Sequence, residues 1–475
     1  MNLRRLLILS FSSLALVGCI ERGDWKPAPQ LRPSALEASR TLGAVQLNAA
    51  AWPADDWWRR YGDLQLDALV GEALAGNPTL ETARARLRAA QAQATAARAA
   101  LLPSTALDGS VIRQRFPVNG LYPPPYGGNY WTQGQLTLDL SYDLDFWGHN
   151  RALAAAARSD VQAAQADQAA ARLALAVAVV RAYIQLDLQY ALLDVSNDNL
   201  KQQTAIRDLT QERVSAGLEN VARVKQSEGQ LALTRAGVAA VEANIELARN
   251  QLAELAGAGP DHAQQLTRPR LAAPSGIELP SVLPADLLGR RPDVAAARAQ
   301  VEAARAGVRA AEAQFYPNVN LTAFAGFQSL GLSQLFEASD RTLGGGPALS
   351  LPLFNRDALR GALHGRQAQV DLSVAQYNQT LLDAVREVAD VVANWRALER
   401  ETREQQLALD DAQRSYELTT ERYRAGLDNY LSVLSSQNQV LLAQGLGAEL
   451  DSRRLSFSVD LVRALGGGYA ATPAG

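Results

Sequence analysis

The chain holds two very long segments that contain no helix breaker. Residues 149–216 have neither Gly nor Pro, and the same is true of residues 366–425. The surrounding segments also match: Glu212-Arg213-Val-Ser-Ala-Gly217-Leu218 recurs as Glu421-Arg422-Tyr-Arg-Ala-Gly426-Leu427. A repeat of this length indicates that a whole structural unit has been duplicated, because solenoid repeats are much shorter.

The duplication predicts equivalent helices in each half. They are expected over 79–102, 149–216 and 218–256 in the first copy, and over 293–316, 366–425 and 427–465 in the second. If the two shorter helices of each copy stack end to end, each composite rod matches the unbroken helix beside it, at roughly 95–100 Å. A two-stranded coiled coil is the alternative. The absence of a clean a/d heptad and the spread of apolar residues over more than one face argue against it.

Between these helices the apolar pattern changes to a period of two. Strands are predicted over 104–116, 130–146, 318–329 and 342–354. In the second of them Leu136, Leu138 and Leu140 share one face. Each strand is longer than the ~9–11 residues that cross a bilayer when tilted. The alternation suits a barrel with lipid outside and water inside; two soluble hairpins capping a helical bundle are the alternative.

The N-terminus has the pattern of an export signal. Arg4-Arg5 precede an apolar stretch that ends at Gly18-Cys19, and this stretch is too short for an ordinary membrane-spanning helix. The pattern resembles a bacterial lipobox, which implies a signal peptide over 1–18 and a Cys19 that carries diacylglycerol and an N-acyl chain such as palmitate. Ile20 in place of Asp then implies transfer to the outer membrane. The alternative is an ordinary signal peptide with an incidental Cys.

Composition excludes several classes of function. The net charge of −3 offers no polybasic surface for nucleic acid. The single Cys excludes a disulfide framework within one chain, and His149, His262 and His364 are isolated, so no metal site is predicted. There is no catalytic constellation and no glycine-rich phosphate loop. We therefore predict that the protein is not an enzyme and binds no cofactor beyond the lipid at Cys19.

Four strands cannot span a membrane alone, because the two sheet edges would leave backbone groups unpaired in hydrocarbon. Two copies would give an eight-stranded barrel filled by side chains, whereas three would give twelve strands and a water-filled lumen. No stretch of 18 consecutive apolar residues follows the signal, so any other crossing of the membrane must be by strands. The expected fold class is mainly α with a small β part. It is internally duplicated, and a homotrimer forms a 12-stranded transmembrane β-barrel continued by a periplasmic α-helical barrel. The expected domains are a lead segment over 19–70, a first repeat over 71–256, an equatorial linker over 257–292, a second repeat over 293–465 and a tail over 466–475.

The segment Leu283-Pro284-Ala-Asp286-Leu287-Leu288-Gly-Arg290-Arg291-Pro292-Asp293, the two Ala-Gly-Leu turns and the lipobox together carry a family resemblance. The chain resembles outer-membrane efflux proteins of the TolC family, in the lipoprotein branch of NodT-type and OprM-like channels. The resemblance covers essentially the whole mature chain. It implies a passive exit duct in the outer membrane of a Gram-negative bacterium, with a periplasmic adaptor protein and an RND-type inner-membrane pump as partners.

The resemblance also implies where gating and docking occur. The two tips, at Gly217 and Gly426, would form the closed periplasmic aperture, and Leu218 and Leu427 would meet the adaptor. Tyr423, Asp428 and Arg223 fall on positions that link helices in similar channels. The charges of Arg223 and Asp428 are reversed relative to some relatives, so we expect a swapped pair or, alternatively, two solvated charges. Where relatives place acidic rings this chain has Ser432 and Ser435, which leaves Glu219 and Asp428 as acidic candidates and predicts weak cation selectivity.

Two other functions compete with drug or metabolite efflux. An exit duct for a type I protein secretion system would share the fold, and the Leu-Pro-Ala-Asp-Leu-Leu signature favours efflux over it. A periplasmic adaptor or coiled-coil lipoprotein without a pore is the other alternative, and the four long amphipathic strands argue against it.

Overall fold

The computed structural model describes residues 25–32, 36, 52–122, 124–272, 290–352 and 354–470. Cys19 and the signature residues 283–289 lie outside the described residues. The chain divides into two compact units. We call them the strand unit (residues 25–30, 87–164 and 297–377) and the hairpin unit (residues 31–86, 165–296 and 378–475).

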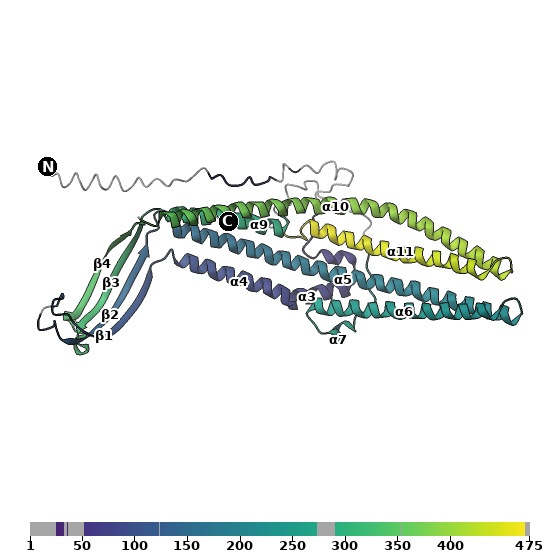
Figure 1. Cartoon of the computed structure of the whole chain (residues 1–475), viewed down its shortest axis with the longest axis horizontal. Helices are drawn as coiled ribbons and strands as arrows, with labels where there is room; N and C mark the ends of the chain where they lie inside the picture. The colour runs from purple at the N-terminus through teal and green to yellow at the C-terminus, as the bar shows by residue number, and fades with distance from the viewer. Residues whose placement is uncertain are drawn as a thin grey trace. The chain divides into compact units, whose positions relative to one another are not determined.

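The strand unit contains one antiparallel sheet in the order β1-β2-β3-β4 (Figure 1). Its strands are β1 (Ser104–Arg115), β2 (Tyr130–Asp143), β3 (Asn318–Leu330) and β4 (Arg341–Ser350). Its register places Leu107, Leu138, Ala325 and Leu343 in one row across all four strands. The adjacent row, on the opposite face, holds Asp108, Thr137, Gly326 and Thr342. The expected alternation of an apolar and a polar face is confirmed, and both copies of the repeat contribute to each face.

Two strands end earlier than the sequence pattern predicts. β2 stops at Asp143 rather than at residue 146, because Asp145 adopts a positive φ of 42° and its carboxylate accepts the backbone N–H groups of Asn150 and Arg151 at 3.0 and 2.9 Å. Those bonds satisfy the first turn of the following helix. β4 stops at Ser350 rather than at residue 354. Pro352 lies just beyond it and has no N–H group to offer a ladder.

Six helices carry most of the chain. They are α4 (Pro78–Ala99), α5 (His149–Ser215), α6 (Val221–Ala256), α9 (Pro292–Ala313), α10 (Arg356–Arg424) and α11 (Tyr430–Ala464). α10 begins ten residues before its predicted start at 366, passing through Gly361 and Gly365. A glycine costs a helix interior only about 1 kcal/mol relative to alanine, and buried residues such as Leu363 and Val370 hold this segment by packing.

α6 and α11 begin later than predicted, because an asparagine caps each of them. Asn220 Oδ1 accepts the backbone N–H of Arg223 at 3.2 Å, and Asn429 Oδ1 accepts that of Ser432 at 3.1 Å. Asparagine is among the best residues at this position, where its side chain satisfies a free donor of the first turn. Leu218 and Leu427 therefore lie in the turns and not in the helices.

The core of the hairpin unit surrounds the middle of α5. There Val180, Tyr183 and Leu186 are fully buried among residues from η2 (Trp57–Tyr61), α3 (Leu64–Gly76) and α6. α3 packs its buried face, which includes Leu66 and Val70, into the same core. The predicted domain boundary at residue 70 falls inside this helix, and the predicted division into domains stays a prediction. The predicted linker holds the short helix α7 (Pro260–Ala263).

A buried arginine joins three segments of the hairpin unit. Arg291 is 5% exposed, and its Nε and Nη2 donate to the Asp293 carboxylate at 3.0 and 2.6 Å. Its Nη1 donates to Glu387 at 2.8 Å and to the carbonyl oxygen of Ala464 at 3.1 Å. Arg463 also reaches Glu387, at 3.2 Å. This network ties the start of α9 to α10 and to the end of α11.

Candidate functional site: the hairpin tips

The hairpin unit contains two helical hairpins whose turns are built identically. Gly217 joins α5 to α6 with φ 73°, and Gly426 joins α10 to α11 with φ 74°. Leu218 N donates to the Arg213 carbonyl at 2.8 Å, and Leu427 N donates to the Arg422 carbonyl at the same distance. This pattern is a Schellman motif, which favours glycine at the residue of positive φ. The repeat seen in the sequence is therefore also a repeat of turn geometry.

Each tip exposes an apolar side chain. Leu218 is 65% exposed and Leu427 is 69% exposed, and both lie at the reversal of the chain. Apolar side chains fixed at the end of a hairpin can be buried by a partner with little loss of conformational entropy. The two leucines are thus exposed at the turns, and their docking to an adaptor stays a prediction.

The structure gives Arg223 and Asp428 different partners within one chain. Arg223 Nη1 donates to Gln226 Oε1 at 3.0 Å. Asp428 accepts the backbone N–H of Asn429 at 2.8 Å, and Arg422 Nε lies 3.4 Å from its carboxylate. The Ser432 hydroxyl, the Asn429 N–H and Arg422 lower the pKa of Asp428. Arg223 and Asp428 are thus not joined within the chain, and a contact between them stays a prediction.

The remaining predicted aperture residues lie around the same turns. Glu219 and Ser432 are partly buried, and Ser435 is exposed. The lowered pKa of Asp428 means that its carboxylate stabilises the tip above the ordinary aspartate pKa, and that this stabilisation is lost as the pH falls through the lowered value. Asp428 thus stays negative at neutral pH, which leaves it available as the acidic group expected at the aperture.

An aromatic pair that the sequence did not reveal lies within the α10–α11 hairpin and contacts the end of α5 in the other hairpin. Tyr423 and Tyr430 are each 1% exposed, and their rings lie 6.5 Å apart between α10 and α11. Arg213, at the end of α5, lies over the Tyr423 ring at 4.8 Å and donates from Nη1 to the Tyr423 carbonyl at 3.2 Å. Within the chain, Tyr423 offers its ring face and its backbone carbonyl to Arg213, and its part in linking helices at the aperture stays a prediction. We call this set the Arg213–tyrosine clamp.

A ladder of amides continues the contact between the two hairpins. Gln437 on α11 is 0% exposed, and its Oε1 accepts a hydrogen bond from Gln203 Nε2 at 2.9 Å. Its own Nε2 donates to Asn199 at 3.1 Å and to Gln202 at 3.2 Å. Buried amides are costly unless paired, so this ladder fixes the register of α5 against α11.

Replacing Arg213 by alanine is expected to loosen this part of the hairpin unit. The substitution removes a charged hydrogen bond and a cation–π contact, which together predict a roughly tenfold rise in local opening. Chymotrypsin cleavage after Tyr423 and Tyr430 in the purified protein measures that opening. Lys225→Ala is the control, since Lys225 is exposed and pairs with Glu228 along the same helix. Equal cleavage of the two variants would contradict a clamp.

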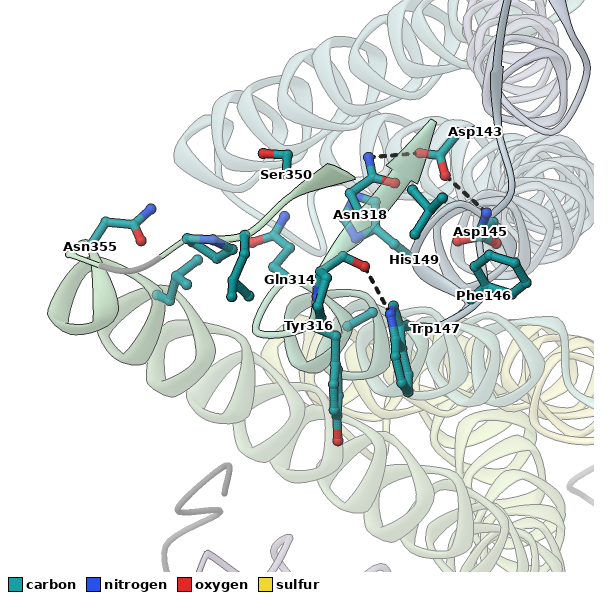
Figure 2. Close-up of a pocket in the computed structure, with 16 residues that line it drawn as sticks. Asp143, Asp145, Phe146, Trp147, His149, Gln314, Tyr316, Asn318, Ser350 and Asn355 are labelled. Atoms are coloured by element: carbon teal, nitrogen blue, oxygen red, sulfur yellow. Dashed lines mark hydrogen bonds between the residues drawn. The ribbon is translucent and has the colours of Figure 1, made fainter. Parts of the chain in front are cut away.

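The strand unit has a cavity at the junction of strands and helices. It measures about 480 Å³ and lies among the ends of β2, β3 and β4 (Figure 2). Trp147 stacks on Tyr316 with ring centroids 4.3 Å apart and donates from its indole N–H to the Pro317 carbonyl at 2.9 Å. Asp143 and Asp145 are engaged by amide and guanidinium donors. These carboxylates are thus used to fix the junction.

Two features of the described residues bear on the predictions. In the described ranges, no group of three or more His, Cys, Asp or Glu residues is arranged to hold a metal ion. One described helix, α5, contains an 18-residue window apolar enough, by length and composition alone, to cross a membrane, and half of that window is buried within the structure. Polar and charged residues interrupt the apolar residues of α5, so this helix contains no unbroken run of 18 apolar residues.

Internal duplication, four amphipathic strands and two long helical hairpins together characterise one class of outer-membrane channel. The chain belongs to the outer membrane efflux protein family, whose profile matches residues 69–258 and again residues 283–467. The two matches correspond to the two copies of the repeat, and the predicted family resemblance is confirmed. It follows that the protein resides in the outer membrane.

Individual relatives agree with this assignment. The chain is 34% identical to the multidrug resistance outer membrane protein MdtP of Escherichia coli K12, over 99% of this chain and 98% of that protein. It is 42% identical to the fusaric acid resistance protein FusA of Burkholderia cepacia, over 75% of this chain and 68% of that protein. Among solved structures, the outer membrane protein VceC of Vibrio cholerae superposes with a TM-score of 0.84 at 37% identity, covering 88% of this chain and 100% of that one.

Proposed function

We propose that the protein is the outer-membrane duct of a tripartite efflux system. Small molecules would pass from an inner-membrane RND-type pump through a periplasmic adaptor into the helical part of a homotrimer, and leave through its 12-stranded barrel. The near full-length similarity to MdtP, a protein named for multidrug resistance, carries this proposal. The two open edges of the four-stranded sheet, β1 and β4, support it, because only further copies of the chain can close them in a membrane.

The proposed role is passive and needs no catalytic group. The charged groups described above form structural bonds, as at Arg291 and at Asp145, and the energy for transport would come from the pump. The lipid anchor at Cys19 is part of the proposal and rests on the lipobox alone.

Cross-linking from the tip tests this function and identifies the partner. A photo-reactive amino acid is placed at Leu427 in the full-length protein in its native host, and the adducts are identified by mass spectrometry. We expect the adaptor of a proton-driven pump. The adaptor of an ATP-driven exporter would instead assign the duct to type I protein secretion. The absence of any periplasmic adduct would contradict docking at the tip. The same residue placed at exposed Leu247, away from the turn, is the control.

A further inference from the structure

The two hairpin tips carry equivalent arginines that make different contacts. Arg213 and Arg422 occupy the same position in the repeat, as do Val214 and Tyr423. Arg213 crosses from α5 to α10 and donates to the Tyr423 carbonyl at 3.2 Å. Arg422 turns back onto its own tip, where its Nε lies 3.4 Å from Asp428 and its Nη2 lies 3.4 Å from the Leu427 carbonyl. One arginine thus joins two hairpins, whereas its equivalent stays within one.

The contact of Arg422 with Asp428 is weak enough to be exchanged. The Arg422 side chain is 59% exposed, and a surface ion pair of this kind contributes little to stability. Asp428 would remain satisfied without Arg422, because the Ser432 hydroxyl and the Asn429 N–H also bind its carboxylate. Arg422 can therefore reach a new acceptor without leaving a buried charge behind.

A ring of duplicated chains supplies such an acceptor. In a closed ring, α10 of one copy faces the α5–α6 hairpin of the next copy much as α5 faces the α10–α11 hairpin of its own chain. We propose that Arg422 donates to the backbone carbonyl of Val214 of the neighbouring copy. This inference rests on the proposed trimeric duct. This contact repeats, between chains, the bond that Arg213 makes within the chain.

The side chains at the two seams differ in a way that has a consequence for opening. The seam within the chain holds Ile206, Tyr423, Tyr430 and Val433, which are all buried. The equivalent positions at the seam between copies are Ser415, Val214, Val221 and Val224. The between-chain seam thus has no aromatic ring under its arginine, and Val221 is 63% exposed in the single chain. The seam between copies is the weaker one, so we expect the aperture to open there.

Chemical cross-linking tests whether the seam exists. Cysteines are placed at positions 214 and 422 (Val214→Cys with Arg422→Cys) in the full-length protein, which is treated in membranes with a short bismaleimide. We expect covalent dimers and trimers on a denaturing gel. The control pair Arg213→Cys with Tyr423→Cys is expected to link within one chain and to leave a monomer. If the first pair yielded only monomers while the control pair was linked, the proposed contact between copies would be overturned. If the untreated protein were not a trimer, the proposed function itself would fail.

Channel recordings test the consequence for opening. Val214→Tyr places an aromatic ring under Arg422, as Tyr423 lies under Arg213. We expect it to lower the opening frequency of the full-length channel in planar bilayers roughly tenfold, as the combined effect of the three seams of a trimer. Val214→Leu adds volume without a π face and is the control. The effect is expected to disappear when Arg422→Ala is combined with Val214→Tyr. A tyrosine effect that persists in the double variant, or that leucine reproduces, would contradict the proposal.

Discussion

Replacing Arg291 by alanine is expected to destabilise the hairpin unit by about 3–5 kcal/mol, the usual cost of removing one partner from a buried ion pair. The guanidinium makes four hydrogen bonds, to Asp293, Glu387 and the Ala464 carbonyl. Its removal leaves the partly buried Glu387 with Arg463 as its remaining arginine partner. Thermal unfolding of the purified protein, followed by tryptophan fluorescence, measures the change.

One further variant separates the geometry of Arg291 from its charge, and a second serves as a control. Arg291→Lys keeps the positive charge but loses the planar fork that binds Asp293 through two nitrogens, so it should recover only part of the lost stability. Arg290→Ala is the matched control, because Arg290 is exposed and lies over the Trp52 ring at 4.8 Å. If Arg291→Ala were no more harmful than Arg290→Ala, the network would not hold these segments together.

Replacing Leu138 by arginine is expected to prevent stable insertion of the barrel. Leu138 lies near the middle of β2, on the apolar face in the row of Leu107, Ala325 and Leu343. An arginine on the lipid face near the bilayer midplane costs roughly 2–4 kcal/mol, and a trimer incurs that cost three times. The measurement is the amount of protein in the outer-membrane fraction that shows heat-modifiable migration on a gel.

The control for this variant lies on the same strand. Gln135 faces the opposite side of the sheet, in a row with Ser110 and Gln328. Gln135→Arg should therefore place its charge in a water-filled lumen and leave insertion unchanged. Equal loss of insertion in both variants would mean that the apolar face does not meet lipid.

The sequence predicted the features that depend on local chemistry. The turns at Gly217 and Gly426 require glycine at a positive φ, and the strand faces follow from strict alternation, so both were visible in the printed chain. The errors at the ends of elements have causes that the apolar pattern alone does not reveal. Asp145 ends β2 by capping α5, and α10 continues through Gly361 because distant residues pack against it.

Contacts between distant parts of the chain could not be found in this way. Arg213 and Tyr423 are 210 residues apart, and Arg291 and Glu387 are 96 apart. Charge reversal suggested Arg223 and Asp428 as a pair. Within the chain Arg223 bonds to Gln226 and Asp428 lies beside Arg422, and a contact between Arg223 and Asp428 stays a prediction. The repeat did contain one usable signal: Val214 aligns with Tyr423. Of the two equivalent arginines, Arg213 can therefore lie on an aromatic ring, whereas Arg422 would meet a valine.

The number of chains in the membrane complex decides whether the sheet can close into a duct. One chain leaves both sheet edges open, two chains give a barrel filled by side chains, and three chains give a water-filled barrel. The measurement is the native mass of the full-length protein extracted from membranes in detergent. A trimeric duct requires the mass of three chains, and therefore twelve strands. A mass of one chain or of two chains would contradict the duct.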